Sequence, residues 1–163
     1  MTLTDEARIK LQRDTVAQHM AGENEHDWDK VYDTFIQDER AWYDVMPFAT
    51  RYAGFSGVQD FYAAFEAAVP DFTLTVTHSY DVPGCSIREV TVTGTHQGEF
   101  LGVAPQGRPI SFELAAFYLF GDGDEAGKLL AERVYFDTET VLRQMRGEDG
   151  PAGIGLADET GAR

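Results

Sequence analysis

Asp137 stands where two sequence patterns meet. Before it, polar and apolar residues alternate up to Phe136, as in a strand, and after it Val141, Leu142 and Met145 recur at helical spacing. Two interpretations are open. An Asp directly before a helix is a good N-cap. A carboxyl group in an aromatic-walled cavity instead loses solvation, so its pKa rises from about 3.9 towards values useful for proton transfer.

Histidines are the second candidate group for proton transfer. His96 shares the strand phase of Val90 and Val92, which predicts an inward position. There it is either only hydrogen-bonded or a proton carrier beside Asp137. His78 has the same inward phase near a strand end. His19 and His26 lie in predicted helical segments rich in acidic residues and are expected to be exposed to solvent.

Aromatic residues could form the walls of a small-molecule pocket, because the chain has 19 of them. Most are expected to be core, and some must line any cavity between sheet and helices. The candidates for substrate contact are Tyr32, Trp42, Tyr43, Phe55, Tyr62, Phe65, Phe117, Tyr118 and Tyr135. Glu113 and Glu132 interrupt apolar strands, and solvent-facing positions are slightly favoured for both.

Motifs for other chemistries are missing or incomplete. Asp122 and Asp124 have calcium-loop spacing, but the last ligand position falls on Arg133. No HExxH pair, phosphate-binding glycine loop or GxSxG elbow occurs. We therefore expect no metal and no cofactor, which leaves acid–base chemistry in an apolar pocket, or binding alone.

Composition limits the partners. The 28 acidic and 13 basic residues give a formal charge of −15, which argues against nucleic acid and membrane surfaces. The lone Cys85 excludes an internal disulfide. The charged segment MTLTDEARIK does not resemble a signal peptide, and no apolar run approaches membrane-spanning length. We expect one soluble, cytoplasmic domain, because 163 residues are enough for one core and too few for two.

Helices and strands that would position these residues follow from the spacing. Thr4 caps a first helix to about Met20, and a second carries the stripe from Trp28 to Phe35. A short strand ends at Pro47, and Ser56 with Gln59 forms a capping box that opens the next helix. Strands are predicted over residues 72–80, 88–100, 110–120 and 128–137, before a helix over 138–147.

This order predicts an α+β fold with helices on one face of an antiparallel sheet. The strand 110–120 is apolar on both faces, so its second face needs cover from another subunit, which predicts a homodimer. Residues 148–163 are rich in Gly, Ala and acid and are expected to be a disordered tail.

Three segments together resemble the SnoaL-like polyketide cyclases of the nuclear transport factor 2-like superfamily. They are TGTHQGEFLGVAPQGRPISF, DTETVLRQM and FSGVQDFYAAFEAAVPDF. The positions that fit the family's patterns are His96, Gly98, Phe100, Gly102, Pro105, Gly107 and Arg108 in the first, Asp137, Leu142 and Gln144 in the second, and Gly54, Phe61, Tyr62, Pro70 and Asp71 in the third.

The resemblance implies one domain over residues 1–147, a cone-shaped barrel of a curved, mostly antiparallel sheet wrapped by N-terminal helices, and a homodimer through the sheet. It implies ring closure by aldol condensation on a hydrophobic carbonyl compound, without cofactor or metal, with Asp137 as acid–base residue and His96 or a tyrosine as donor. The family's second polar residue, often His, is missing from the penultimate strand, where Tyr118 or Glu113 could substitute. Isomerases, hydrolases and non-catalytic binding proteins share the superfamily, so a ligand-binding or dimeric interaction protein is the alternative.

Overall fold

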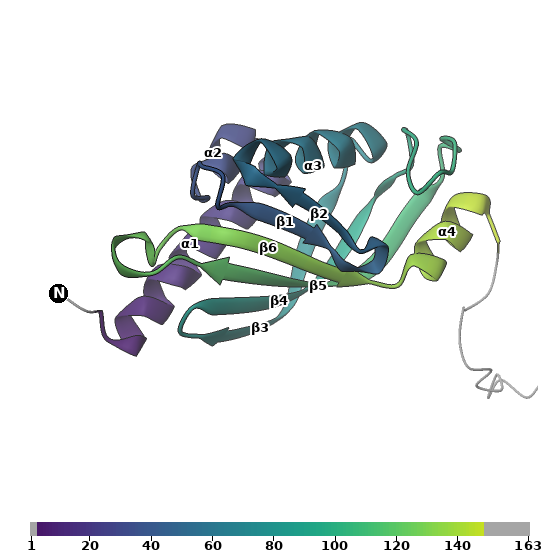
Figure 1. Cartoon of the computed structure of the whole chain (residues 1–163). Helices are drawn as coiled ribbons and strands as arrows, with labels where there is room; N and C mark the ends of the chain where they lie inside the picture. The colour runs from purple at the N-terminus through teal and green to yellow at the C-terminus, as the bar shows by residue number, and fades with distance from the viewer. Residues whose placement is uncertain (1–2, 149–163) are drawn as a thin grey trace, which may run out of the picture.

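Six strands form one curved, unclosed sheet in the order β2-β1-β6-β5-β4-β3 (Figure 1). The structure is a computed structural model that describes residues 3–148. The strands are β1 (Trp42–Val45), β2 (Thr50–Ala53), β3 (Thr73–Val82), β4 (Cys85–Thr95), β5 (Pro109–Phe120) and β6 (Leu129–Phe136). The helices are α1 (Asp5–Glu25), α2 (Trp28–Tyr32), α3 (Gly54–Ala68) and α4 (Thr138–Arg146), with short 3-10 turns η1 (Met46–Phe48) and η2 (Gly123–Glu125).

The predicted α+β class and the four-strand meander β3–β6 are confirmed. All neighbouring strands are antiparallel except β1 and β6, which pair in parallel. Strand β2 was not predicted, because it is four residues long and pairs with β1 through the turn η1, just after Pro47. This hairpin extends the sheet beyond β6, so the sheet is mixed but mostly antiparallel.

Helix α1 is longer than predicted and continues past Met20 to Glu25. The residues AGENE are helical, and His26, whose φ is 54°, is the C-cap of the helix. Gly22 in this segment allows α2 to pack closely against α1, because a Cβ there would lie 2.9 Å from Cγ2 of Val31.

The helix caps were predicted with mixed success. Thr4 caps α1, because its hydroxyl accepts a hydrogen bond from the amide of Ala7 at 3.2 Å. The capping box at Ser56 is wrong. Helix α3 already begins at Gly54, and its N-cap Ala53 makes no side-chain cap.

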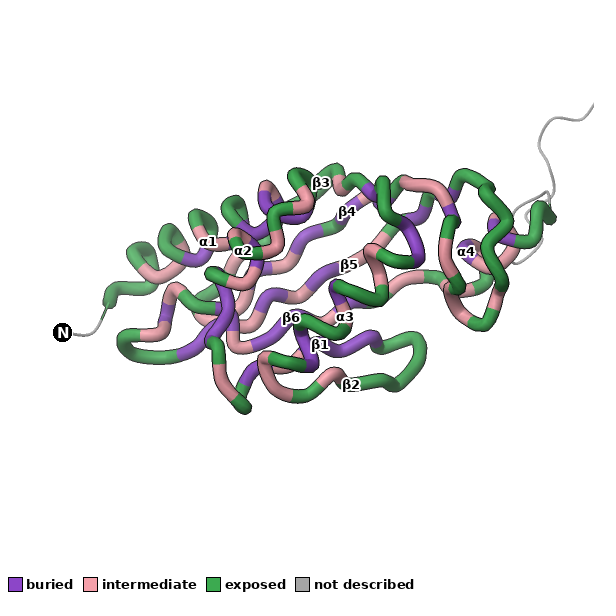
Figure 2. The backbone as a smooth tube through the Cα atoms, turned by 90° about the horizontal axis from the view of Figure 1, so that it is seen from above, coloured by how far each residue is buried: buried purple, intermediate pink, exposed green. Residues whose placement is uncertain are grey.

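Helices α1 and α3 lie over the same face of the sheet, and buried positions alternate along the strands (Figure 2). A β-bulge in β3 changes the phase of that alternation between Val76 and His78. The inward position predicted for His78 is therefore wrong. Its side chain is 63% exposed and its Nδ1 lies 2.9 Å from a carboxylate oxygen of Glu89.

The predicted tail, residues 148–163, lies outside the described residues except for Glu148. None of the helices in the described part of the chain has both the length and the apolar character that a membrane span requires.

Candidate functional site

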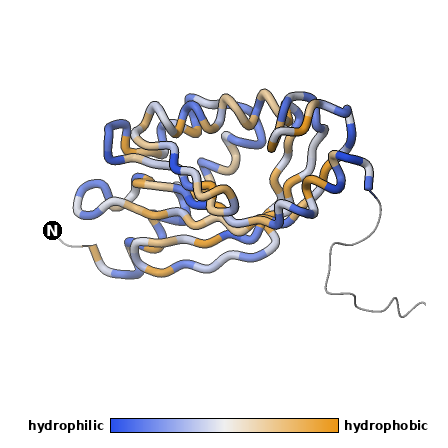
Figure 3. The backbone as a smooth tube through the Cα atoms, turned by 45° about the vertical axis from the view of Figure 1, so that its right-hand side comes forward, coloured by the Kyte–Doolittle hydropathy of each residue, from blue (hydrophilic) through white to orange (hydrophobic). Residues whose placement is uncertain are grey.

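A cavity of about 230 Å³ lies between the helices and the inner face of the sheet. Its walls are mainly aliphatic and aromatic side chains, and Figure 3 shows that hydrophobic residues occur along the strands of the sheet. Three carboxylates line it, those of Glu23, Glu99 and Glu132. No Lys, Arg or His of residues 3–148 lines it. The exposed lining residues are Phe48, Ala64 and Glu99, so the mouth lies between η1, α3 and the loop after β4.

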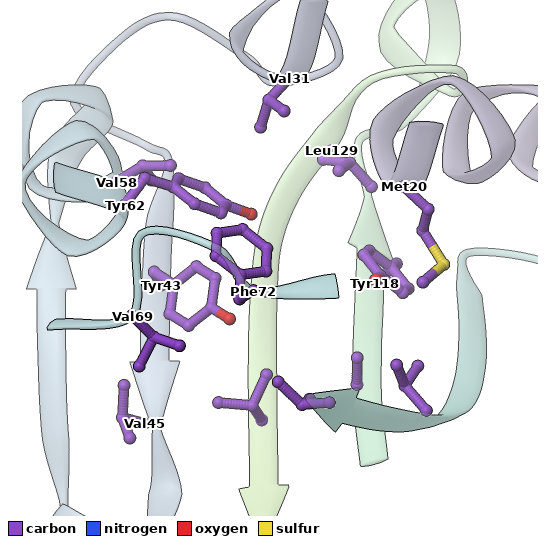
Figure 4. Packing of buried hydrophobic residues seen from close by; sticks show 14 of the residues in the cluster. Met20, Val31, Tyr43, Val45, Val58, Tyr62, Val69, Phe72, Tyr118 and Leu129 are labelled. Carbon is purple, nitrogen blue, oxygen red and sulfur yellow. The ribbon is translucent and has the colours of Figure 1, made fainter. Parts of the chain in front are cut away.

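Several predicted pocket aromatics line this cavity. Figure 4 shows Tyr43 from β1, Tyr62 from α3 and Tyr118 from β5 around the same interior. Phe65 from α3 also lines the cavity. The phenol rings of Tyr43 and Tyr62 bring polar atoms into an otherwise apolar space.

The other predicted aromatics do not line the cavity. Three of them lie on the outer face of the sheet, because each is next in sequence to a residue that points inward: Trp42, Phe117 and Tyr135. Tyr32 and Phe55 pack edge-to-face at 5.7 Å between α2 and α3. The prediction named aromatic residues without assigning the phase of each strand, which is why it included both faces.

A buried hydrogen-bond network closes one end of the cavity around Glu132. Tyr43 and Tyr62 donate their hydroxyls to its two carboxylate oxygens, at 3.3 and 2.9 Å. Nε2 of His19 lies 3.3 Å from Oε2 of Glu132 and 3.0 Å from the Tyr62 hydroxyl. Glu132 and His19 are both buried, so the expectation that they face solvent is wrong.

Hydrogen-bond accounting fixes the protonation of His19. The Thr34 hydroxyl donates to the carbonyl of Val31 at 2.6 Å. It must therefore accept from Nδ1 of His19, 2.9 Å away, so Nδ1 carries a proton. Nε2 faces oxygen atoms of Glu132, Glu23 and Tyr62, which favours a second proton there.

The pKa of His19 agrees with this imidazolium form. Complete burial alone would lower the pKa, but the negative charge of Glu23 and the hydrogen bond and charge of Glu132 outweigh it and raise the pKa from 6.5 to about 10. The imidazolium therefore balances the negative charge of one carboxylate at this end of the cavity.

Glu23 is the carboxylate with unused bonding capacity. It lines the cavity, is only 5% exposed, and its Oε2 makes no hydrogen bond in the described part of the chain. The nearest basic atom is Nε2 of His19, at 3.6 Å. Burial raises the pKa of Glu23 above 4.5, and the charge of His19 opposes this rise only in part.

Tyr118 complements Glu23 as an unused donor. It is buried on β5 and lines the cavity, and no hydrogen bond of its hydroxyl occurs within residues 3–148. Burial, together with the charges of Glu132 and Glu23, raises the pKa of Tyr118 well above 10. The hydroxyl therefore keeps its proton and can donate it to a ligand in a hydrogen bond.

Asp137 has the geometry of the helix cap. Its carboxylate accepts hydrogen bonds from the Thr140 hydroxyl at 2.7 Å and from the Glu139 amide at 3.0 Å. It is exposed and does not line the cavity. The Thr140 hydrogen bond lowers the pKa of Asp137, opposite to the rise that the catalytic interpretation requires.

His96 is buried, as predicted, but does not line the cavity or contact Asp137 through any hydrogen bond. Neither ring nitrogen has a hydrogen-bond partner among residues 3–148. Its backbone pairs with Arg108 and Gly107 at the base of the loop after β4. The structure therefore does not bring the two predicted catalytic residues together.

Metal-ligand types are present in one place. One ligand atom from each of His19, Glu23 and Glu132 lies within 4.8 Å of the others. This set could hold a divalent cation, although the same atoms already interact with one another. The expectation of metal-free chemistry stays a prediction.

Comparison with protein families assigns the chain. Residues 13–145 match the SnoaL-like polyketide cyclase family, which covers most of the sequence. The chain belongs to the SnoaL-like polyketide cyclase family. The resemblance seen in the sequence is thereby confirmed. A search of curated proteins found no match.

Solved structures share the fold of this SnoaL-like chain at low identity. AclR from Streptomyces galilaeus is 21% identical, with a TM-score of 0.71 over 88% of this chain and 87% of its own. A SnoaL-like protein from Jannaschia sp. CCS1 is 16% identical, with a TM-score of 0.77 over 91% and 99%. A protein with a ketosteroid isomerase-like fold from Catenulispora acidiphila is 17% identical, with a TM-score of 0.64 over 84% and 97%. The nuclear transport factor 2-like fold is thereby confirmed.

The sequence interpretation missed Glu23 and Thr34 and misplaced His19. One signal was available, because His19 and Glu23 are four residues apart and therefore share a helix face with Val16 and Met20. Ending the helix near Met20 hid this pattern, since Glu23 then fell in a loop.

Proposed function

We propose that this SnoaL-like protein catalyses acid–base chemistry on a hydrophobic carbonyl compound, with Glu23 in place of Asp137 as the group that exchanges the proton. Aldol-type ring closure, isomerisation and hydration all belong to this class of reaction. The observation that carries the proposal is an acceptor, Glu23 Oε2, and a donor, the Tyr118 hydroxyl, that line the same apolar cavity and make no hydrogen bond within the described residues.

Glu23 is suited to remove a proton from the carbon next to a carbonyl. Its raised pKa brings the carboxyl group closer to neutral pH, where a general base works best. The electron pair of the broken C–H bond moves into an enolate, whose oxygen accepts a hydrogen bond from Tyr118. In ring closure the enolate carbon attacks a second carbonyl, and protonated Glu23 returns the proton to the new alkoxide.

His19, Glu132 and Tyr62 act as positioning residues. The positive charge of the His19 imidazolium partly offsets the negative charge of Glu23. Glu132 holds the imidazolium in place, with its Oε2 3.3 Å from Nε2 of His19. The apolar walls keep water from the enolate and hold a flexible chain in a reactive pose.

Exchange of α-protons for deuterium tests the proposal without knowledge of the natural substrate. We would follow 2-tetralone in D₂O by proton NMR with the wild-type protein. Enzyme-dependent exchange is expected, and Glu23→Gln is expected to reduce it about 10²- to 10⁴-fold. Tyr118→Phe removes only the donor and is expected to reduce exchange about 10- to 10³-fold.

Asp137→Asn is the matched control, because Asn also caps helices and the substitution removes the same charge. Exchange within about threefold of wild type is expected. If Asp137→Asn abolished exchange and Glu23→Gln did not, the proton would belong to Asp137, as the family resemblance implies. Exchange that no substitution affects would favour the non-catalytic binding protein.

We also propose the predicted homodimer, formed through the outer face of the sheet. Apolar side chains gather there on neighbouring strands, and Tyr80, Val82 and Tyr135 are 52%, 57% and 42% exposed. Ile87 and Phe117 are paired in register between them. Such a face on a mixed sheet needs cover. The cytoplasmic location stays a prediction.

A further inference from the structure

We propose that the cavity selects its ligand by charge: it admits an uncharged aromatic carbonyl compound and rejects the corresponding carboxylate. The inference rests on the proposed function only in using the same cavity. It names the substrate class more closely.

The charged groups of the cavity all have the same sign. Glu23 and Glu132 lie at its closed end and Glu99 at its mouth, and none of the described lining residues is basic. His19 is the basic group nearest to the closed end, but it does not line the cavity. Its Nε2 already has three oxygen atoms between 3.0 and 3.6 Å away.

The hydrogen-bond donors of the cavity also favour an uncharged ligand. Tyr43 and Tyr62 direct their hydroxyl protons to Glu132, so neither is available to a ligand. Tyr52 and Tyr118 also line the cavity, and neither hydroxyl makes a hydrogen bond within residues 3–148, so the donors left for a ligand are neutral phenols. A neutral donor matches the oxygen of a ketone or aldehyde. A carboxylate brings two charged oxygens and would lose its hydration beside Glu23 without a cation to replace it.

The volume limits the buried part of the ligand. An apolar cavity of about 150 Å³ holds benzene. At about 230 Å³, the present cavity has room for roughly two fused rings, and the aromatic walls provide faces for such rings.

Three probes of similar size and different charge test the inference. They are 2-acetylnaphthalene, 2-naphthoate and 2-naphthylmethylamine, titrated into the wild-type protein at pH 7 and 0.15 M salt, with binding followed by ligand-observed NMR. We expect the ketone and the ammonium ion to bind. We expect 2-naphthoate to bind at least about a hundredfold more weakly than the ketone.

Glu23→Gln removes the charge and adds an amide donor at the closed end. It is expected to strengthen 2-naphthoate binding at least about tenfold and to change ketone binding less than about threefold. Glu6→Gln is the matched control, because it removes the same charge from an exposed position of the same helix that does not line the cavity. It is expected to change 2-naphthoate binding less than about twofold.

Equal affinity of the ketone and 2-naphthoate would overturn the inference, and so would the binding of none of the three probes. Binding and proton exchange separate the two proposals. If Glu23→Gln leaves exchange intact but admits 2-naphthoate, the proposed function fails and the charge selection stands. If Glu23→Gln loses proton exchange while the wild type binds 2-naphthoate and the ketone equally, the charge selection fails and the proposed function stands.

Discussion

At the residue scale, the proposed site depends on Glu23, a buried carboxylate whose Oε2 makes no hydrogen bond within residues 3–148. Glu132 has its charge balanced by two tyrosine hydroxyls and His19, which is how buried charges are normally accommodated. Glu23 lies beside the same network, where its Oε2 is 3.6 Å from Nε2 of His19, too far for a hydrogen bond. A buried polar atom without a hydrogen bond costs stability, so its position next to a cavity supports the proposal that a ligand completes it.

Thr34 tests the protonation of His19 at this scale. Thr34→Val removes the acceptor for Nδ1–H and leaves a buried donor unsatisfied, which is expected to lower the free energy of unfolding by about 1–3 kcal/mol. Thr34→Ser keeps the hydroxyl and should cost about 1 kcal/mol or less. Urea denaturation measures both, and nitrogen-15 NMR of His19 reports the tautomer. An unprotonated Nδ1 in the wild type would contradict the assignment.

The pH dependence of stability tests the charge balance. The folded protein holds the His19 proton up to about pH 10, whereas an unfolded histidine releases it near 6.5. This stabilising contribution is therefore complete below about pH 6.5 and disappears as the pH rises through about 10. The raised pKa of Glu23 also makes stability fall as the pH rises, because the folded carboxyl group keeps a proton that the unfolded chain releases above pH 4.5.

We therefore expect the free energy of unfolding to fall between pH 6.5 and 10, measured by urea denaturation at several pH values. His19→Gln should flatten this fall. His78→Gln is the control, because that ring is exposed and its removal should keep the slope. An equal slope in wild type and His19→Gln would show that His19 is neutral when folded.

At the element scale, the loop after β4 positions the mouth of the cavity. Its first residues dock on the end of α3, where the amides of Gln97 and Gly98 both donate to the carbonyl of Ala68, at 2.9 and 3.0 Å. Glu99, Phe100 and Leu101 follow directly and line the cavity. The docking geometry of α3 thus decides how wide the mouth is.

Gly98→Ala tests this docking. An added Cβ would overlap the backbone of Ala67, so we expect the loop to shift and the free energy of unfolding to fall by about 1–3 kcal/mol. Gly102→Asn is the control. Gly102 has no atom within 4 Å of an added Cβ, and Asn tolerates its φ of 73°. Equal stability of the two variants in urea denaturation would contradict the docking.

At the scale of the whole molecule, the sheet has one face for the cavity and one face without cover. The phase of each strand assigns every side chain to one of them. Tyr118 faces the cavity, and its neighbour Phe117 lies on the outer face 5.6 Å from the ring of Tyr135. The ligand site and the proposed dimer interface are therefore made by alternating residues of the same strands.

Phe117→Glu tests the interface by placing a charge at the centre of the outer face. Sedimentation equilibrium is expected to show a dimer for the wild type and a monomer for Phe117→Glu. Ala63→Glu is the control, because it adds the same charge at an exposed position on α3 and should remain dimeric. A monomeric wild type, or a dimeric Phe117→Glu, would contradict the proposed interface.

Local patterns in the sequence determined much of the protein. Alternation with period two gave the meander β3–β6, and the Thr4 cap and the sequence DTETVLRQM gave helix boundaries, because neighbouring residues decide these features. The three family segments also indicated the fold, which the family assignment and the solved structures confirmed.

Tertiary structure alone decided the site. Thr34, Tyr62 and Glu132 come from different elements, and His19 is 113 positions from Glu132, so no local spacing connects them. The bulge in β3 moved His78 outward, although its strand pattern looked regular. Asp137 shows the converse, because its geometry is that of the local interpretation, a cap bonded to the next turn. Local bonds can be predicted from neighbouring residues, whereas burial and its effect on a carboxyl group depend on what the rest of the chain packs around it.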